Sequence, residues 1–343
     1  MKALKRRCLI PWLFIALGLF FPAKPMSGEL AAKMPRVMEP FFLTIADGRI
    51  YIAENSSIAH LYTIGSNEVT FVKSFGHEGQ GPGEFRFMYR IRVNKDHLDI
   101  SGNYKLVRFS LDGEYIDEVR VPVGMFKGAI DQIGENYLIK DLQFSVKEIT
   151  ITINLYDKNF KLIREIGTQK EVYGLKKLNL VAEVFSYRTA DDQIFIITSG
   201  KESIVTVYDR NGIRQKEIKL PLEPIKVTAD LKEAVIKPLR EDPELRDRWS
   251  IFEKQIYFPN KTPGLDYFDI VDGKFIARTY RYRNNSVEFV IFDEQGRELQ
   301  RIFLPHTGRL SNGILFCFYQ GCYYYLLYNF EEEAWELHCE KVW

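Results

Sequence analysis

Arginine and tyrosine alternate in the stretch RTYRYRNN, and this pattern carries the clearest binding chemistry in the chain. In an extended strand Arg278, Tyr280 and Tyr282 share one face, and Arg281 and Arg283 lie on or near the other. Guanidinium groups bind anions through charge-assisted hydrogen bonds, and they also stack with aromatic rings. The stretch therefore predicts either a site for an anion or a sugar, or a structural ladder of stacked side chains.

Other polar side chains fall in segments that connect predicted strands, where binding residues usually lie. The predicted ligand-binding residues are His77, Glu78, Lys201, Tyr280, Arg281, Tyr282, Arg283, His306 and Arg309. The 5 histidines are widely spaced, and the sequence contains no H-E-x-x-H, C-x-x-C or G-x-S-x-G motif. We therefore predict no catalytic residue, no metal ligand and no cofactor.

Six short stretches share a tight polar turn followed by apolar residues, the pattern of the turn and second strand of a hairpin. The first residues after these turns are Arg49, His97, Asn136, Gln193, Lys274 and Cys322. A further turn and strand follow, so that each unit contains four antiparallel strands. Units of this kind are typical of propeller blades, which must stack on neighbours to bury both faces. The predicted fold is an all-β, six-bladed β-propeller.

The sixth unit contains only three predicted strands before Trp343. The segment at about residues 30–37 precedes the first blade, and we expect it to supply the missing strand. That pairing would close the ring and hide an open strand edge.

An insertion at about residues 222–266 separates the fourth and fifth blades. Thr228 is a predicted helix cap, and apolar residues recur after it at helical spacing. After Asp242 the pattern restarts, which predicts two short amphipathic helices. They would act as a flap over the channel, or as a lid or partner-docking element.

The glycine-rich stretch GHEGQGPGEF, residues 76–85, connects the first and second blades. It lacks the Lys-Ser/Thr ending of a phosphate loop, and Pro82 removes a main-chain donor, so we interpret it as a connecting turn. Its glycines and phenylalanine are Gly76, Gly79, Gly81, Gly83 and Phe85. This spacing, followed by strands and a hairpin, resembles the NHL repeat and the wider group of six-bladed bacterial propellers. Met88-Tyr89 stands where that family usually has a proline.

The resemblance implies the fold, and it also implies an alternative function, because some six-bladed relatives are metal-dependent hydrolases, lactonases or lyases. Those enzymes place carboxylates, amides or histidines where the first strand of each blade begins. Here these positions are mostly apolar: Phe41, Met88, Phe126, Phe185, Tyr267 and Ile314.

We distinguish two faces of the propeller by their connections. The tight-turn face carries the turns between the first and second and between the third and fourth strands of each blade, and the long-loop face carries the remaining connections. Ligand sites usually lie in long loops on a rigid scaffold. We therefore predict a non-enzymatic scaffold that recognises a protein, peptide or glycan on the long-loop face. A calcium- or zinc-dependent hydrolase, lactonase or lyase is the alternative.

The first 28 residues combine a basic start with an apolar run from Cys8 to Phe21, the build of a secretory signal peptide. We expect export to the periplasm or the extracellular space, with an uncleaved amino-terminal membrane anchor as the alternative. Cleavage near Gly28 would leave 42 basic and 46 acidic side chains, a net charge of about −4. That sign argues against nucleic acid as a partner.

Three cysteines, Cys317, Cys322 and Cys339, lie in the predicted sixth blade. An odd number allows one disulfide with one free thiol, or three unpaired thiols.

Overall fold

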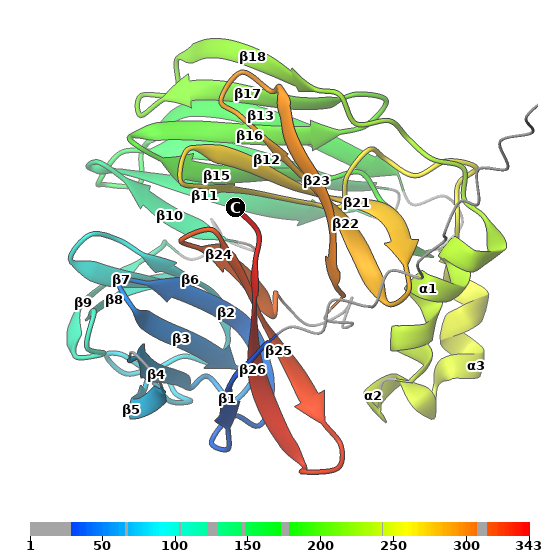
Figure 1. Ribbon diagram of the computed structural model, residues 1–343. Coiled ribbons are helices and arrows are strands. Elements are labelled where there is room, and N and C mark those ends of the chain that lie inside the picture. The colour runs from blue at the N-terminus through cyan, green and yellow to red at the C-terminus, as the bar shows by residue number, and fades with distance from the viewer. Residues whose placement is uncertain are drawn as a thin grey trace, which may run out of the picture.

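The computed structural model describes residues 29–65, 68–102, 104–122, 129–145, 148–172, 178–241, 243–306 and 314–343. Six four-stranded antiparallel sheets surround a central axis, as the repeat predicts (Figure 1). The first strand of each unit lies innermost, so that β2 contacts both β6 and β24. This arrangement brings residues from all six blades to one central channel.

The blades follow one another in chain order. Blade 1 contains β2 (Pro40–Ala46), β3 (Arg49–Glu54), β4 (Ala59–Ile64) and β5 (Val69–Phe75), and blade 2 contains β6 (Met88–Val93), β7 (His97–Gly102), β8 (Lys105–Ser110) and β9 (Tyr115–Arg120). Blade 3 contains β10 (Ile130–Ile133), β11 (Asn136–Phe144), β12 (Glu148–Tyr156) and β13 (Leu162–Val172), and blade 4 contains β15 (Phe185–Ala190), β16 (Gln193–Ser199), β17 (Ser203–Asp209) and β18 (Arg214–Leu220). Blade 5 contains β20 (Tyr267–Val271), β21 (Lys274–Arg283), β22 (Ser286–Phe292) and β23 (Glu298–Pro305), and blade 6 contains β24 (Phe316–Tyr319), β25 (Cys322–Asn329) and β26 (Ala334–Lys341).

The six predicted post-turn residues begin the second strand of their blades. They are Arg49, His97, Asn136, Gln193, Lys274 and Cys322. In the turn before Arg49, both Asp47 (φ 47°) and Gly48 (φ 68°) have positive φ. Two-residue hairpins of this twist require positive φ at both central residues, which aspartate tolerates and glycine favours. The repeat visible in the sequence therefore reflects the residue types that these hairpin turns require.

Blade 6 obtains its fourth strand from the other end of the described chain. Strand β1 (Glu29–Met34) pairs antiparallel with β26, with Met34 opposite Trp335 (Figure 1). Met34 is 0% exposed and Val37 is 3% exposed, and both pack against Trp335 and Leu337. The pairing covers the edge of β26 and closes the ring.

The insertion begins as predicted with a capped amphipathic helix, α1 (Ala229–Arg240). The Thr228 Oγ1 atom accepts a hydrogen bond from the Leu231 main-chain N–H at 3.2 Å. The buried face of α1 is formed by Leu231, Val235 and Leu239. Two of these, Leu231 and Val235, pack with Tyr280 at the long-loop end of blade 5.

The second predicted helix is interrupted, contrary to the sequence prediction. It consists of α2 (Pro243–Arg246), α3 (Trp249–Phe252) and the 3₁₀ turn η1 (Glu253–Gln255). The Arg248 N–H bonds the Leu245 carbonyl, three residues back, which tightens the chain into a turn between α2 and α3. After the helices, β19 (Ile256–Tyr257) forms a short parallel pair with β14 (Leu178–Asn179), which precedes blade 4. Within the ranges described above, no helix has the length and apolar character needed to cross a membrane.

The glycine-rich connection bonds mainly to itself. The Gly79 N–H donates to the Phe85 carbonyl, the Phe85 N–H donates to the His77 carbonyl, and the Gly81 N–H donates to the Glu84 carboxylate. Phe85 is 0% exposed between blades 1 and 2. The stretch is thus a turn that inserts an aromatic anchor, in agreement with our interpretation of its sequence.

Cys317, Cys322 and Cys339 form no disulfide bond among the described residues. The innermost of them, Cys317, lines the central channel on β24.

Candidate functional site

The central channel is the largest of the hollows that we describe, with a volume of about 950 Å³. Its wall is formed by the innermost strands, and it reaches their far ends on the tight-turn face, at Ala46, Lys95, Asp191, Asp272 and Tyr319. The residues at or within two positions of the start of these strands are apolar or aromatic, as expected: Phe41, Met88, Phe185, Tyr267 and Ile314. Phe126, expected in the same ring, lies outside the described residues.

The middle of the channel is charged, which the apolar ring does not reveal. The Arg90 guanidinium of blade 2 donates to the Asp131 carboxylate of blade 3 at 2.9 Å. Arg188 of blade 4 donates to Asp269 of blade 5 at 2.9 Å. Burial lowers the pKa of Arg188, but Asp269 and Tyr267 together outweigh this effect and the net shift is upward. These charge pairs join neighbouring blades, so they contribute first to the ring itself.

A second hollow of about 570 Å³ lies on the tight-turn face, between blades 2, 3 and 4. Arg92, Lys95, Thr189 and Ala190 line both this groove and the channel. The two hollows therefore meet along these residues. We call the tight-turn end of the channel, which includes this junction and the turn residues Asp191 and Asp272, the channel mouth.

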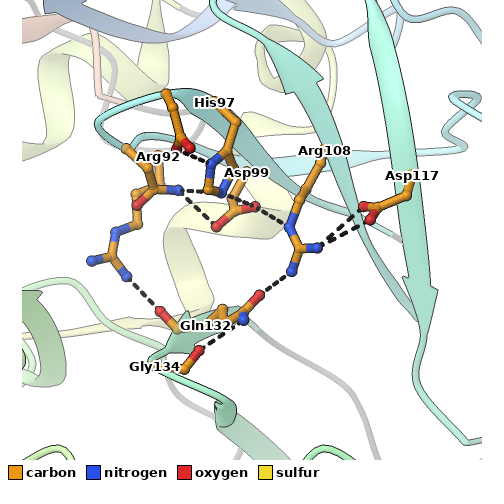
Figure 2. A network of polar contacts seen from close by, with 9 residues as sticks. Arg92, His97, Asp99, Arg108, Asp117, Gln132 and Gly134 are labelled. Carbon is orange, nitrogen blue, oxygen red and sulfur yellow. Dashed lines mark hydrogen bonds and ion pairs between the residues drawn. The ribbon is translucent and has the colours of Figure 1, made fainter.

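A polar network forms one wall of the groove (Figure 2). The His97 ring lies between two carboxylates, with Nδ1 at 2.6 Å from Asp96 Oδ1 and Nε2 at 3.4 Å from Asp99 Oδ1. Asn94 Nδ2 lies at 3.2 Å from the same Nε2 atom and donates to Asp99 Oδ2 at 2.8 Å. Both ring nitrogens of His97 thus have neighbours within the wall.

Arg108 continues the network towards blade 3 (Figure 2). Its guanidinium donates to Asp117 and to the side-chain oxygen of Gln132, and its Nε atom lies 3.5 Å from Asp99 Oδ1. Asp99 is 3% exposed, and this burial raises the pKa of its carboxyl, although His97, Asn94 and Arg108 oppose the shift. The wall is therefore a fixed set of mutually bonded groups.

Several charges at the channel mouth are left without a charged partner. Arg92 donates to the Gln132 carbonyl at 3.1 Å, and no carboxylate of the described residues pairs with it. In the same described part of the chain, the side chains of Lys95, Asp191 and Asp272 form no hydrogen bond or ion pair. The two cations lie on blade 2, and the two carboxylates lie on turns of blades 4 and 5. The mouth consequently has a basic side and an acidic side.

The predicted residues His77 and Glu78 lie in the glycine-rich connection, where both contact other residues of the same loop. The His77 ring contacts Glu84 at 2.9 Å. Glu78 forms an isolated bridge with Phe85. Lys201 lies elsewhere, beside a shallow hollow of about 580 Å³ between blades 3 and 4.

The arginine–tyrosine ladder of β21 is divided between core and surface. Tyr280 is 5% exposed and its hydroxyl donates to the Ala182 carbonyl at 3.4 Å. Tyr282 is half-buried, whereas Arg281 and Arg283 are exposed. A register shift between Arg278 and Tyr282 locally disrupts the pairing with β22. The alternation thus holds as predicted, and the tyrosines are largely structural.

His306 packs against this ladder, with its ring 5.3 Å from that of Tyr282 in an edge-to-face arrangement. Among the described residues, neither ring nitrogen has a hydrogen-bond partner. Burial, and then the positive charge of Arg278, lower the pKa of His306 to about 4. Arg309, predicted to lie near it, is outside the described residues.

The buried His306 predicts a specific loss of stability in mild acid. The unfolded state binds a proton near pH 6.5, whereas the folded state resists it down to about pH 4, so stability falls as the pH falls through this window. We expect the free energy of unfolding to drop by roughly 2 to 3 kcal/mol between pH 7.5 and 4.5. Urea denaturation of His306→Phe should lack this component.

Buried carboxyls act in the opposite direction, because the pKa values of Asp99, Asp266 and Glu340 are raised by burial. Their protonation stabilises the folded state as the pH falls, and this effect is the same in the wild type and in the variant. The difference between the two proteins therefore isolates His306. Equal pH slopes in both would contradict the prediction.

Sequence reasoning did not identify the residues of the channel mouth. Arg90 and Arg92 alternate on the innermost strand β6, with Lys95 in the following turn. Paired arginines on the innermost strand of a blade are the signal that would have pointed to a charged channel. Within the ranges that the structure describes, no three His, Cys, Asp or Glu side chains gather as a metal site would require.

Comparisons with known proteins agree with this architecture. A family model described as a 6-bladed beta-propeller (DUF5128) matches residues 37–179, which include blades 1 to 3. The chain is a six-bladed β-propeller. No curated protein matches it at a significant level.

Three solved structures resemble the chain at low sequence identity. The computationally designed protein Ika8 has 9% identity and a TM-score of 0.40, with 91% of this chain and 99% of that chain covered. BamB from Moraxella catarrhalis has 12% identity and a TM-score of 0.31, with coverages of 86% and 70%. The Pan2 WD40 domain of Neurospora crassa has 9% identity and a TM-score of 0.40, with coverages of 84% and 75%. At identities this low, the function of these proteins cannot be transferred to this chain.

Proposed function

We propose that this protein is an exported, non-enzymatic binding scaffold that holds a peptide segment of a partner protein at the channel mouth. The supporting observation is the division of unpaired charge there. Arg92 and Lys95 offer donors on one side, and Asp191 and Asp272 offer acceptors on the other. A peptide segment that carries both an acidic and a basic group would satisfy both sides.

The polar wall of the groove supports binding rather than catalysis. His97 contacts Asp96, Asp99 and Asn94, and Arg108 is bonded on three sides, so these groups are oriented by one another. A general base needs a free lone pair within reach of a substrate proton. The fixed wall instead presents a rigid surface, which lowers the entropic cost of binding.

This location differs from the long-loop face that loop length alone favours. The predicted residues on that face lie in separate places, at the glycine-rich connection, at the hollow beside Lys201 and on β21. The channel mouth, in contrast, joins the central channel, the largest of these hollows, to the groove between blades 2, 3 and 4.

Selection of peptides from a phage-displayed library on the purified protein would test the proposal. We expect enriched peptides to contain both an acidic and a basic residue. The double variant Arg92→Gln, Lys95→Gln should weaken binding of an enriched peptide by about tenfold, because two partners of its acidic group are lost. Lys201→Gln, on the opposite face, is the matched control and should leave the affinity unchanged.

Three results would overturn the proposal. The first is that no peptide is enriched, and the second is that Lys201→Gln weakens binding as much as the channel-mouth variant. The third is stoichiometric, tightly held calcium or zinc in the purified protein, which would favour the metal-dependent enzyme instead.

A further inference from the structure

A separate cavity of about 310 Å³ lies on the long-loop face, where the insertion meets blade 5. The two ends of the insertion form one wall, and β21 and β23 form the other. The ends are bonded to each other, because the Thr262 N–H donates to the Ile225 carbonyl and the Val227 N–H donates to the Asn260 carbonyl. These bonds hold the wall in place before any ligand binds. The volume of the cavity is at the lower end of the range for small-molecule sites.

A buried carboxylate fixes the arginines of the opposite wall. Glu288 is 3% exposed and accepts hydrogen bonds from Thr279 Oγ1 at 2.8 Å and from Arg301 at 2.9 Å. It also lies 3.5 Å from Arg281 Nε. Because Glu288 engages this Nε edge, the terminal nitrogens of Arg281 remain available, and no described residue bonds them.

The insertion supplies an acceptor to the same cavity. The exposed Glu223 side chain lines it, and no described residue bonds or pairs with its carboxylate. Leu222 and Pro263 add apolar surface. The cavity thus combines a planar pair of donors, a carboxylate acceptor and a short apolar wall.

We propose that this cavity binds a neutral saccharide unit. Each sugar hydroxyl both donates and accepts, so one hydroxyl can accept from Arg281 while another donates to Glu223. Behind the lining, Glu288 lies against both Arg281 and Arg301, and Glu298 pairs with Arg301, so these carboxylates offset the positive charge of the wall. Glu223 adds a negative charge within the cavity, and this balance disfavours an anionic ligand. The site is distinct from the channel mouth and is independent of the function proposed above.

Saturation-transfer NMR and calorimetry with methyl glucoside, methyl galactoside, methyl mannoside and N-acetylglucosamine test this inference on the purified protein. We expect saturable binding of at least one of these sugars. Arg281→Gln and Glu223→Gln should each weaken it at least about tenfold, since each removes one charged hydrogen-bonding partner. Both side chains are exposed, so the variants should fold normally.

Arg283→Gln is the matched control, because Arg283 is an exposed arginine on the same strand and does not line the cavity. It should bind the sugar as the wild type does. Failure to bind any of the four sugars, or binding that Arg281→Gln leaves unchanged, would overturn the inference. Preferential binding of glycine or glucuronate, tested in parallel as zwitterionic and anionic probes, would also overturn it. The channel-mouth variant Arg92→Gln, Lys95→Gln should not affect sugar binding, so this test and the peptide test can fail separately.

Discussion

Truncation of Met34 to alanine should lower the free energy of unfolding by about 2 to 5 kcal/mol, the range for emptying a fully buried site of this size. Met34 is 0% exposed and packs in the core that β1 shares with blades 1 and 6. The lost side chain leaves a cavity between β1 and the strand that it must hold. Chemical denaturation monitored by tryptophan fluorescence measures the loss.

Met38 provides a control four residues further on. The residue is 72% exposed, and its hydrogen bonds involve the main chain: the N–H donates to Glu54 Oε1, and the carbonyl accepts from Trp335 Nε1 at 3.0 Å. Met38→Ala should therefore change the stability by less than about 0.5 kcal/mol. Equal effects of Met34→Ala and Met38→Ala would show that β1 does not secure the ring.

Replacement of Asp131 by alanine should cost about 3 to 5 kcal/mol, because it leaves the Arg90 guanidinium in the channel wall without its counter-charge. Asp131 is 2% exposed, and the Arg90 side chain is 23% exposed. The variant removes one of the polar contacts between blades 2 and 3, by changing its blade 3 partner. Thermal and urea unfolding should both report the destabilisation.

An exposed ion pair between blades 1 and 2 provides the comparison. Arg49 contacts Asp112 at 3.1 Å, and the Asp112 side chain is 73% exposed. Asp112→Ala should cost less than about 1 kcal/mol, since water screens the pair and replaces the lost contact. If Asp131→Ala were as mild as Asp112→Ala, the channel charges would not hold the blades together.

The fold was predictable because its signals are local. The turn residues before Arg49 and Lys274, such as Asp47-Gly48 and Asp272-Gly273, adopt the positive φ that these residue types favour. The Thr228 cap of α1 likewise depends on contacts within one helical turn. Closure by β1 followed from counting strands in the sixth blade, and the pairing with β26 confirms it.

The channel mouth was not predictable because its contacts depend on how neighbouring blades align. Arg90 pairs with Asp131, 41 residues away, and Arg188 pairs with Asp269, 81 residues away. Each residue alone has the pattern of an ordinary strand charge. The break between α2 and α3 was also not predictable. The apolar spacing of Trp249 and Phe252 indicates a continuous helix, but the chain turns at Arg248, whose N–H bonds the Leu245 carbonyl.

The pairing of β1 with β26 has a consequence for how the chain acquires its structure. Trp335 bonds the Met38 carbonyl across 297 positions of sequence, a contact of very high sequence separation. Contacts of this kind slow folding, because a long loop must close before they form. While the chain emerges from a ribosome or a translocation pore, the early blades therefore form an open arc. Until the last strand is in place, the end blades of that arc leave apolar sheet faces uncovered. This open state would be the one most prone to binding by chaperones or by another copy of the chain.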